Sequence, residues 1–353
     1  MSIYRTELRI WVVGLGTVGQ WLLRALDSDA ERLARRYGVR FTVVGAANAR
    51  DGFIYDADGL DISALLELIG DGRSIVDEPG VRHWPTAIEG LRETEADVLV
   101  EVTGSPADGE PGYAHMREAL GRGKPVVTSN KWPVALHGVE LAALAGAGRV
   151  AFRAESTVMS GTPVLAPLVE GLAGTRPVAL RGILNATSNF ILSAMSQGRS
   201  YEDALAQAEA AGLAERGVEA DVDGSDAMAK TMIIAGLVFG RQLRPEQVLR
   251  RGITAVTRAE IDDALAAGGR IRHVATLEFA EPDGAGEVKA GVEPMLLSGT
   301  DPLAAVEGTA NVVVCRVEPV GDVTIIGAGA GLELAGQGVL SDLIAVARSR
   351  AGR

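Results

Sequence analysis

The chain has little cysteine, little histidine and no long apolar run. Its 353 residues include 1 cysteine, Cys315, and 4 histidines. A single cysteine excludes an internal disulfide framework and fits a reducing cytoplasm, and its apolar strand-like surroundings predict a buried structural thiol. The histidines are far apart and show no metal-ligand spacing, so we expect them on the surface or in loops. No apolar run approaches the roughly 20 residues that span a membrane, so we expect no membrane segment.

A clustered basic face is also missing. The net charge is -12, and the basic residues are scattered along the chain. A nucleic-acid partner would require a basic patch, so we expect none. The length suggests two domains with a substantial core, and 47% apolar with 23% charged residues is ordinary for a soluble globular protein.

A glycine-rich turn follows the first apolar strand, Leu8–Val13, and precedes a helical segment. In this strand–turn–helix context, Gly14 permits a tight turn, Gly16 lets a pyrophosphate approach the backbone, and Gly19 lets the helix pack closely on the strand. The N-terminus of the helix offers N–H donors to the phosphates. We therefore predict dinucleotide binding by Gly14, Leu15, Gly16, Thr17, Val18 and Gly19.

The second strand, Arg40–Ala47, ends without the acidic residue that often holds the ribose of NAD. Arg50 lies close by and can accommodate a 2′-phosphate. We predict that NADP is preferred or that both dinucleotides are accepted. The alternative is that Arg50 is merely solvated.

Further apolar strands are predicted at Asp97–Gly104 and Lys124–Lys131, after a helical and looped insertion at residues 52–85. The strand ends carry Thr103 and Lys131, which would face the cofactor. A lysine there could serve in chemistry, although an isolated lysine is more often a surface residue.

The segments imply an α/β protein with a Rossmann-type parallel-sheet cofactor domain and a mixed α/β catalytic and dimerisation domain. We predict the cofactor domain at residues 1–148, the catalytic and dimerisation domain at 149–326, and a segment returning to the cofactor domain at 327–353.

One short window, Gly212–Lys230, is crowded with carboxylates. Its first half should be irregular, and its second half should be a buried helix capped by Ser225 or Asp223. Asp226 and Lys230 lie four residues apart and so share one face of that helix. An isolated pair of this kind is more often a surface ion pair, but the neighbouring carboxylates favour a site.

Several motifs together resemble those of the homoserine dehydrogenase family over nearly the whole chain. They are the glycine turn at 14–19, Thr128–Lys131, Gly182–Leu192, the substrate signature from Ala214 to Lys230, and Gly327–Gly331. Ala186 departs from a glycine of the family pattern, and Arg216-Gly217 replaces a frequent Asp-Pro. The C-terminal regulatory domain that many members carry is not expected.

The resemblance implies reversible NAD(P)-dependent interconversion of L-homoserine and L-aspartate 4-semialdehyde in threonine, methionine and isoleucine biosynthesis by a homodimer. It implies that Lys230 is the acid/base, with Asp226 orienting it and Lys131 near the nicotinamide. It assigns the substrate to Gly212, Glu215, Asp221 and Asp226, and Gly331 to the cofactor. It further implies a Na⁺ or K⁺ held around Glu155, Val158, Ser160 and Thr162.

Two alternatives remain at this point. Aspartate-semialdehyde dehydrogenase shares the cofactor fold, but it requires a reactive cysteine, for which Cys315 is a poor candidate. A non-catalytic dinucleotide-binding sensor would not require the two lysines and the carboxylates.

Overall fold

The computed structural model describes residues 6–104, 106–213, 218–280, 286–329 and 331–351. The chain divides into two compact units. The first unit comprises Met1–Gly161 and Leu332–Arg353, and the second comprises Thr162–Gly331. The sequence predicted divisions after residues 148 and 326. The short strand β7 (Phe152–Arg153) pairs with the sheet of the first unit, so the residues around it belong to that unit.

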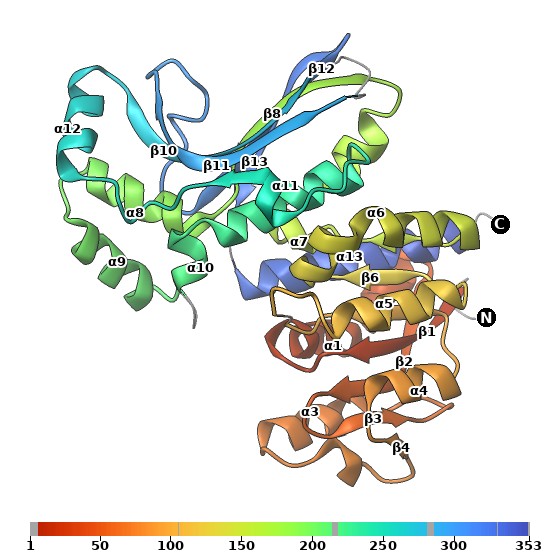
Figure 1. Ribbon diagram of the computed structural model, residues 1–353. Coiled ribbons are helices and arrows are strands. Elements are labelled where there is room, and N and C mark those ends of the chain that lie inside the picture. The colour runs from red at the N-terminus through yellow and green to blue at the C-terminus, as the bar shows by residue number, and fades with distance from the viewer. Residues whose placement is uncertain (1–5, 105, 214–217, 281–285, 330, 352–353) are drawn as a thin grey trace. The chain divides into compact units, whose positions relative to one another are not determined.

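A seven-stranded sheet of order β4-β3-β2-β1-β5-β6-β7 forms the first unit (Figure 1). Its other strands are β1 (Thr6–Val13), β2 (Val39–Asn48), β3 (Gly52–Tyr55), β4 (Arg82–Trp84), β5 (Val98–Glu101) and β6 (Val126–Thr128). Strands β2, β1, β5, β6 and β7 are parallel. The strand order reverses between β1 and β5, which is the position where open α/β sheets bind dinucleotides. The predicted Rossmann-type parallel sheet is confirmed.

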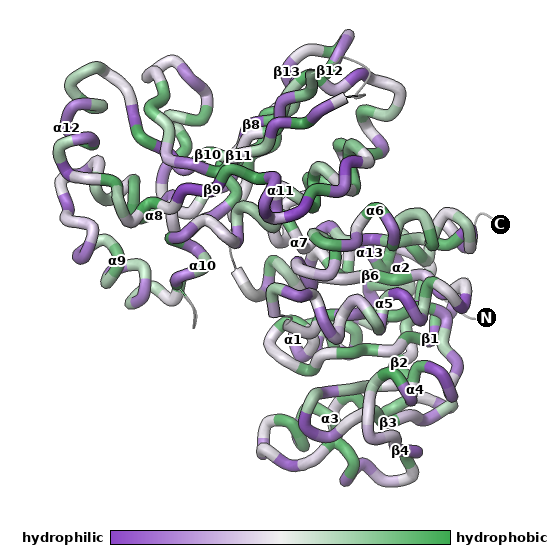
Figure 2. Tube along the Cα trace, in the orientation of Figure 1, coloured by the Kyte–Doolittle hydropathy of each residue, from purple (hydrophilic) through white to green (hydrophobic). Residues whose placement is uncertain are grey.

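Helices and apolar strands build the core of the first unit. The helices are α1 (Thr17–Ser28), α2 (Ala30–Tyr37), α3 (Ile62–Gly70), α4 (Ala87–Glu93), α5 (Gly112–Gly121), α6 (Lys131–Gly148), α7 (Ser156–Met159) and α13 (Leu332–Ala351). Apolar residues of β1 and β5 pack in one cluster with Leu22 of α1 and with Leu340 and Leu343 of α13. Figure 2 shows the hydrophobic stretches of the chain in green. This burial of apolar area holds the C-terminal helix in the first unit.

Two local predictions in the first unit were wrong. Residues 52–85 were expected to be helical and looped, and α3 does lie there, but β3 pairs antiparallel with β2 and β4 pairs antiparallel with β3, so two further strands extend the sheet. These strands are too short for a clear period-2 pattern. Lys131 was expected at the end of a strand, but β6 ends at Thr128 and Lys131 begins α6.

The second unit contains a six-stranded mixed sheet of order β13-β12-β8-β10-β11-β9. Its strands are β8 (Arg176–Ile183), β9 (Val248–Arg250), β10 (Arg270–Phe279), β11 (Val288–Leu297), β12 (Ala310–Glu318) and β13 (Gly321–Ala328). Its helices are α8 (Ala186–Ser196), α9 (Tyr201–Ala210), α10 (Val218–Val222), α11 (Ser225–Leu237) and α12 (Arg258–Ala266). Helices α8 and α11 lie against one face of the sheet (Figure 1).

Helix α11 is buried along most of its length, because every residue from Asp226 to Gly236 is buried. This agrees with its nearly continuous apolar sequence. The preceding segment was expected to be irregular, but Val218–Val222 forms the short helix α10. Strand β9 was not predicted, since three residues carry no periodic signal.

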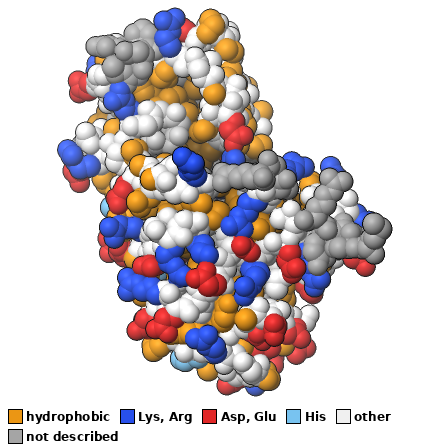
Figure 3. Space-filling model, turned by 90° about the vertical axis from the view of Figure 1, so that its right-hand side faces the viewer, with side chains coloured by type: hydrophobic (Ala, Val, Ile, Leu, Met, Phe, Trp, Pro, Cys, Tyr) orange, Lys and Arg blue, Asp and Glu red, His pale blue; other side chains and the backbone are white. Residues whose placement is uncertain are grey.

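In the part of the chain that the structure describes, no helix is long and apolar enough to cross a membrane. Figure 3 shows acidic and basic side chains interspersed on the face that it presents.

Candidate active site

The glycine turn lies between β1 and α1, and each of its glycines has a different environment. A Cβ atom at Gly14, where φ is 109°, would lie 2.6 Å from the backbone nitrogen of Thr103. A Cβ atom at Gly19 would lie 2.0 Å from the carbonyl oxygen of Gly14. At Gly16 a Cβ atom would meet nothing within 4 Å. The first and last glycines are therefore required by packing, whereas Gly16 faces open space.

That open space fits the phosphates of a dinucleotide. Gly16 is the N-cap of α1, and both Gly16 and Thr17 are exposed. Leu15 is buried beneath the turn and Val18 is half-buried. An exposed helix N-terminus with bare backbone N–H groups is a favourable environment for a pyrophosphate.

Arg50 follows the end of β2, but its guanidinium is already engaged. Its Nε and Nη2 atoms each donate to a carboxylate oxygen of Asp51 at 2.9 Å. Nη1 donates to the carbonyl of Gly72 at 3.1 Å, and Nη2 also donates to the carbonyl of Arg73. The Arg50 guanidinium beside Asp51 holds the pKa of that carboxyl well below its usual range.

The Asp51 carboxylate is itself held by its surroundings. Its side chain is only 7% exposed. Asn48 donates to it at 2.9 Å and Ser74 at 3.0 Å. Because this carboxylate is fixed, Arg50 is held beside it rather than merely solvated.

Thr103, another predicted cofactor residue, lies just beyond the end of β5. Its hydroxyl donates to the buried carboxylate of Glu101 and accepts from Nδ2 of Asn130 at 3.1 Å. Asn130 is the N-cap of α6, and Lys131, half-buried, is the first residue of that helix. Glu101 and Asn130 were not singled out from the sequence, although both stand at the ends of predicted strands.

The remaining predicted cofactor residue, Gly331, lies at the junction of β13 and α13. Its φ of 145° is a conformation that L side chains rarely adopt. Glycine adopts this conformation without strain, and the family resemblance assigned Gly331 to the cofactor. Its role in cofactor binding stays a prediction.

The predicted pair on α11 is formed. Lys230 Nζ lies 2.8 Å from Asp226 Oδ2, and the two side chains are 10% and 8% exposed. Lys230 Nζ also donates to the carbonyl oxygen of Leu184 at 2.7 Å. The alternative of a solvated surface pair is therefore excluded.

Asn185 connects this pair to a second carboxylate. Its Nδ2 donates to Asp226 at 3.0 Å and to Asp221 at 2.6 Å, while its Oδ1 accepts from Ser188 N and so caps α8. Burial raises the pKa of Asp221, and the nearby charge of Asp226 raises it further. Asn185 belongs to the motif 182–192, but the sequence did not single it out as a site residue. The one further indication in the sequence was that asparagine is a common helix N-cap.

The turn before α11 differs from the predicted cap. The N-cap is Gly224, with φ 85°, rather than Ser225 or Asp223. Asp223 instead accepts from the backbone and the hydroxyl of Ser225 in a turn. A Cβ atom at Gly224 would lie 3.1 Å from Cε1 of His273, which is a tight contact, and the positive φ itself favours glycine at this position.

The predicted substrate residues that precede α10 are only partly visible. Gly212 is left-handed, with φ 67°, and follows the end of α9. Thr187 donates to the carbonyl of Leu213 at 3.0 Å, which ties this loop to the start of α8. Glu215 lies outside the described residues.

The residues predicted to hold a cation differ in burial and in hydrogen bonding. Glu155 is buried, and its backbone N–H donates to Asp342 at 2.9 Å. Val158 is buried in α7, and Ser160 has a φ of 53°. Thr162 donates to the carbonyl of Ala328 at 3.1 Å. Among the described residues no group of three or more His, Cys, Asp or Glu side chains could hold a metal ion.

The histidine prediction was wrong for two residues, since His115 and His273 are buried. Burial lowers the pKa of His273 to about 4. Its Nε2 lies 3.0 Å from the carbonyl oxygen of Arg251, and Nδ1 lies 3.4 Å from the hydroxyl of Ser188. The residues next to His273 in the sequence gave no indication that its side chain would be buried.

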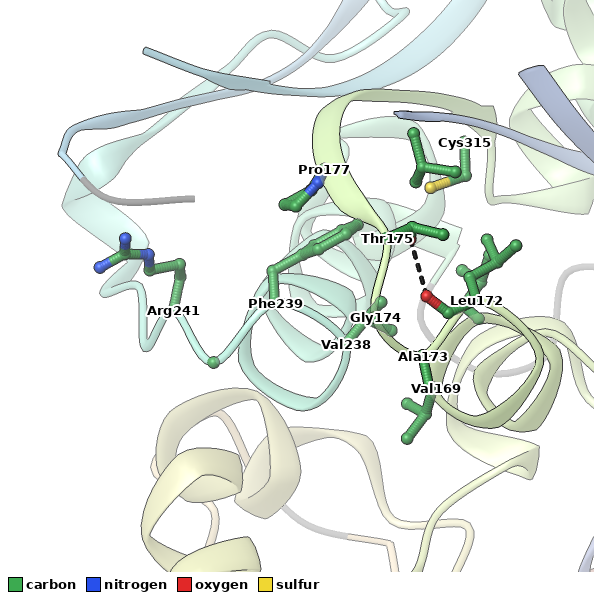
Figure 4. Close-up of a pocket in the computed structure, with 13 residues that line it drawn as sticks. Val169, Leu172, Ala173, Gly174, Thr175, Pro177, Val238, Phe239, Arg241 and Cys315 are labelled. Atoms are coloured by element: carbon green, nitrogen blue, oxygen red, sulfur yellow. Dashed lines mark hydrogen bonds between the residues drawn. The ribbon is translucent and has the colours of Figure 1, made fainter. Parts of the chain in front are cut away.

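Cys315 lies in β12 and is fully buried, as predicted. It lines a cavity of about 310 Å³ together with Phe239, Thr175 and Leu172 (Figure 4). Burial raises the pKa of the thiol to about 11. Such a thiol is a poor nucleophile, which argues against the aspartate-semialdehyde dehydrogenase chemistry.

Comparisons with known proteins indicate the same family for both parts of the chain. A family model described as homoserine dehydrogenase matches residues 163–344, and one described as the homoserine dehydrogenase NAD binding domain matches residues 14–155. The chain is 36% identical over 345 residues to the NAD(+)-dependent homoserine dehydrogenase of Pseudomonas canavaninivorans, covering 98% of this chain and 97% of that protein.

Solved structures show the same likeness. A homoserine dehydrogenase from Thiobacillus denitrificans superposes with a TM-score of 0.81 at 31% identity, covering 100% of this chain and 75% of that chain. A hyperthermophilic archaeal homoserine dehydrogenase in complex with NADPH gives a TM-score of 0.80 at 29% identity, covering 98% of each chain.

Proposed function

The chain belongs to the homoserine dehydrogenase family, and we propose that it catalyses the reversible oxidation of L-homoserine to L-aspartate 4-semialdehyde in amino-acid biosynthesis. The observation that carries the proposal is the buried network of Lys230, Asp226, Asn185 and Asp221. A nicotinamide dinucleotide, bound at the glycine turn, supplies or accepts the hydride.

Lys230 handles the proton of the substrate hydroxyl in this proposal. Hydride leaves an alcohol easily only as the hydroxyl loses its proton, so a positioned acid/base is required. The contacts of Nζ with Asp226 and with the carbonyl of Leu184 hold the ammonium in one place. Lys131, at the start of α6, is proposed to share the proton path near the nicotinamide.

Asp221, with Glu215, is proposed to bind the substrate ammonium, and Gly212 to contribute backbone at the same site. Burial and the charge of Asp226 raise the pKa of Asp221, which disfavours its ionised form in the free protein. An arriving ammonium would offset both effects, so substrate binding and ionisation of Asp221 support one another.

The test is dinucleotide reduction with L-homoserine by the wild type and by Lys230→Ala. We expect kcat to fall by a factor of about 10² or more in the variant, because an acid/base has been removed. Lys289→Ala, on an exposed residue of β11, is the matched control and should retain wild-type kcat.

The proposed activity would be refuted if the wild type oxidised L-homoserine with neither NAD⁺ nor NADP⁺. A Lys230→Ala loss no larger than that of Lys289→Ala would leave the activity standing and refute the role of Lys230.

We further propose that the enzyme favours NAD⁺, in place of the predicted preference for NADP. Arg50 is the first basic residue after the end of β2, but Asp51 neutralises it through both carboxylate oxygens. A 2′-phosphate would have to displace this fixed carboxylate or face it at close range, and like charges repel. The NAD(+)-dependent relative from Pseudomonas canavaninivorans supports the proposal.

Asp51→Asn tests this proposal, since it removes the negative charge and leaves the side-chain shape. We expect the ratio of kcat/KM for NADP⁺ over NAD⁺ to rise by about 10-fold, which corresponds to about 1.4 kcal/mol. Asp58→Asn, on an exposed residue of the same unit, should leave the ratio unchanged. A wild-type preference for NADP⁺, or equal ratios in all three proteins, would contradict the proposal.

We also propose that a Na⁺ or K⁺ binds near Glu155 and Ser160. Glu155 is a buried carboxylate close in sequence to Ser160, whose positive φ is uncommon for a residue other than glycine. Oxygen ligands suit hard cations. Thermal unfolding in potassium, sodium and choline chloride at one ionic strength is the test, and identical midpoints would refute a bound cation.

We propose that the second unit forms a homodimer through the outer face of its sheet. Ile326, in the edge strand β13, is 60% exposed. Within the described residues, α8 and α11 cover one face of this sheet and no helix covers the other (Figure 1). An exposed apolar edge strand tends to pair with another chain. Ile326→Lys should shift the mass measured by light scattering to the monomer, whereas Val76→Lys in the first unit should not.

A further inference from the structure

Glu101 is a buried carboxylate that the proposed reaction does not use. It ends β5 and is 0% exposed. Burying a carboxylate is costly unless hydrogen bonds compensate it. Two side chains donate to it, since Oε1 accepts from the hydroxyl of Thr103 and Oε2 accepts from Nδ2 of Asn130 at 3.1 Å. The ring nitrogen Nδ1 of the buried His115 also lies 3.7 Å from Oε1.

The backbone of α5 and of β6 lies close to Glu101 and Asn130. A Cβ atom at Gly112, the first residue of α5, would lie 2.5 Å from Nδ2 of Asn130 and 3.3 Å from Oε2 of Glu101. The carbonyl oxygen of Glu101 accepts from the hydroxyl of Thr128 at 2.7 Å. Glu101 therefore joins the ends of β5 and β6, which are neighbours in the sheet.

The network determines the direction of the Thr103 hydroxyl. A carboxylate can only accept hydrogen bonds, so the Thr103 proton must point to Glu101. Asn130 Nδ2 also faces Thr103, at 3.1 Å, and occupies one of the two acceptor positions of its oxygen. What Thr103 can offer to a ligand is therefore an acceptor and not a donor.

Thr103 lies where the nicotinamide half of a dinucleotide is expected. Its backbone nitrogen lies 2.6 Å from the Cβ position of Gly14 in the glycine turn. The adenosine ribose belongs at the end of β2, and β5 and β6 lie on the other side of β1. The nicotinamide half therefore extends over the ends of β5 and β6.

We propose that Glu101 is a positioning residue that makes Thr103 an obligate acceptor for the amide N–H of the nicotinamide carboxamide. The group so recognised is a primary carboxamide, and this recognition orients the ring. The inference rests on the nicotinamide cofactor of the proposed function, but not on homoserine as the substrate.

Binding of dinucleotide analogues tests the proposal without turnover. In 3-acetylpyridine adenine dinucleotide a methyl group replaces the amide NH2, whereas thionicotinamide adenine dinucleotide retains the NH2. By isothermal titration calorimetry we expect the acetyl analogue to bind the wild type about 10-fold more weakly than NAD⁺, because one hydrogen bond is lost. The thio analogue should bind within about 3-fold of NAD⁺.

Glu101→Gln should remove this discrimination. The new amide would donate to Thr103 and accept from Asn130, which releases the Thr103 proton towards the ligand. NAD⁺ should then bind more weakly, and the Kd ratio of the acetyl analogue to NAD⁺ should fall to about 2 or less. Glu118→Gln, on a partly exposed residue of α5, is the matched control and should keep the wild-type ratio.

Equal weakening of all three dinucleotides in Glu101→Gln, with the ratio unchanged, would show a merely structural role and overturn the proposal. Thr103→Val and Thr103→Ser provide a second measurement if Glu101→Gln fails to fold. The valine variant should lose the discrimination and the serine variant should keep it, and discrimination that persists in Thr103→Val would equally overturn the proposal. A wild type that binds NAD⁺ but does not oxidise homoserine would refute the proposed activity and leave this inference intact.

Discussion

His273 should make the stability of the protein fall on mild acidification. The side chain is 3% exposed in β10, with Nε2 3.0 Å from the carbonyl oxygen of Arg251. Nε2 therefore carries the proton in the neutral ring, and Nδ1 can accept from Ser188. A second proton would charge a buried ring, which is why burial lowers the pKa to about 4 from an ordinary value of 6.5, although the hydrogen bond with the Arg251 carbonyl and the charge of Asp223 oppose the shift.

The magnitude follows from the two pKa values. The unfolded chain binds the proton near pH 6.5 and the folded chain only near pH 4, so unfolding takes up a proton between these values. Stability is therefore retained above pH 6.5 and lost as the pH falls towards 4. Between pH 8 and pH 5 this single group should lower the free energy of unfolding by about 2 kcal/mol.

The assay is urea unfolding of the wild type and His273→Gln at pH 8 and pH 5, followed by far-UV circular dichroism. Other titrating groups act equally in both proteins, so their effects cancel in the difference. We expect the stability advantage of the wild type to be smaller at pH 5 by about 2 kcal/mol. Wild-type and variant stabilities that fall in parallel would refute a buried neutral histidine at this position.

Three other substitutions test the site. Gly16→Ala should leave the thermal midpoint unchanged but weaken dinucleotide binding in calorimetry about 10-fold, because its Cβ atom would meet only the ligand. Gly19→Ala should lower the midpoint, since its Cβ atom would overlap the carbonyl of Gly14, and equal midpoints would contradict the packing argument. Asp226→Asn should destabilise the protein by about 3 kcal/mol in urea titration, because Lys230 keeps a buried charge without its closest counter-ion, and a loss below about 1 kcal/mol would contradict the buried pair.

Local sequence patterns were sufficient for much of the fold. The glycine turn could be predicted because strand, turn and helix are contiguous and each glycine has a distinct steric role, as the contacts of Gly14 and Gly19 confirm. The apolar run after Lys230 predicted the buried helix α11. Strands β3, β4 and β9 were missed because three or four residues carry no reliable period.

The sequence by itself determined the dinucleotide turn, the parallel sheet and the common helix face of Asp226 and Lys230, since these depend on residues close together in the chain. Only the tertiary structure decided that Asn185 joins this pair to Asp221. It also placed Asp51 against Arg50 and buried His273 beneath Gly224. Partners and burial of this kind depend on side-chain direction and on contacts between segments far apart in sequence, which a linear pattern of residue types does not contain.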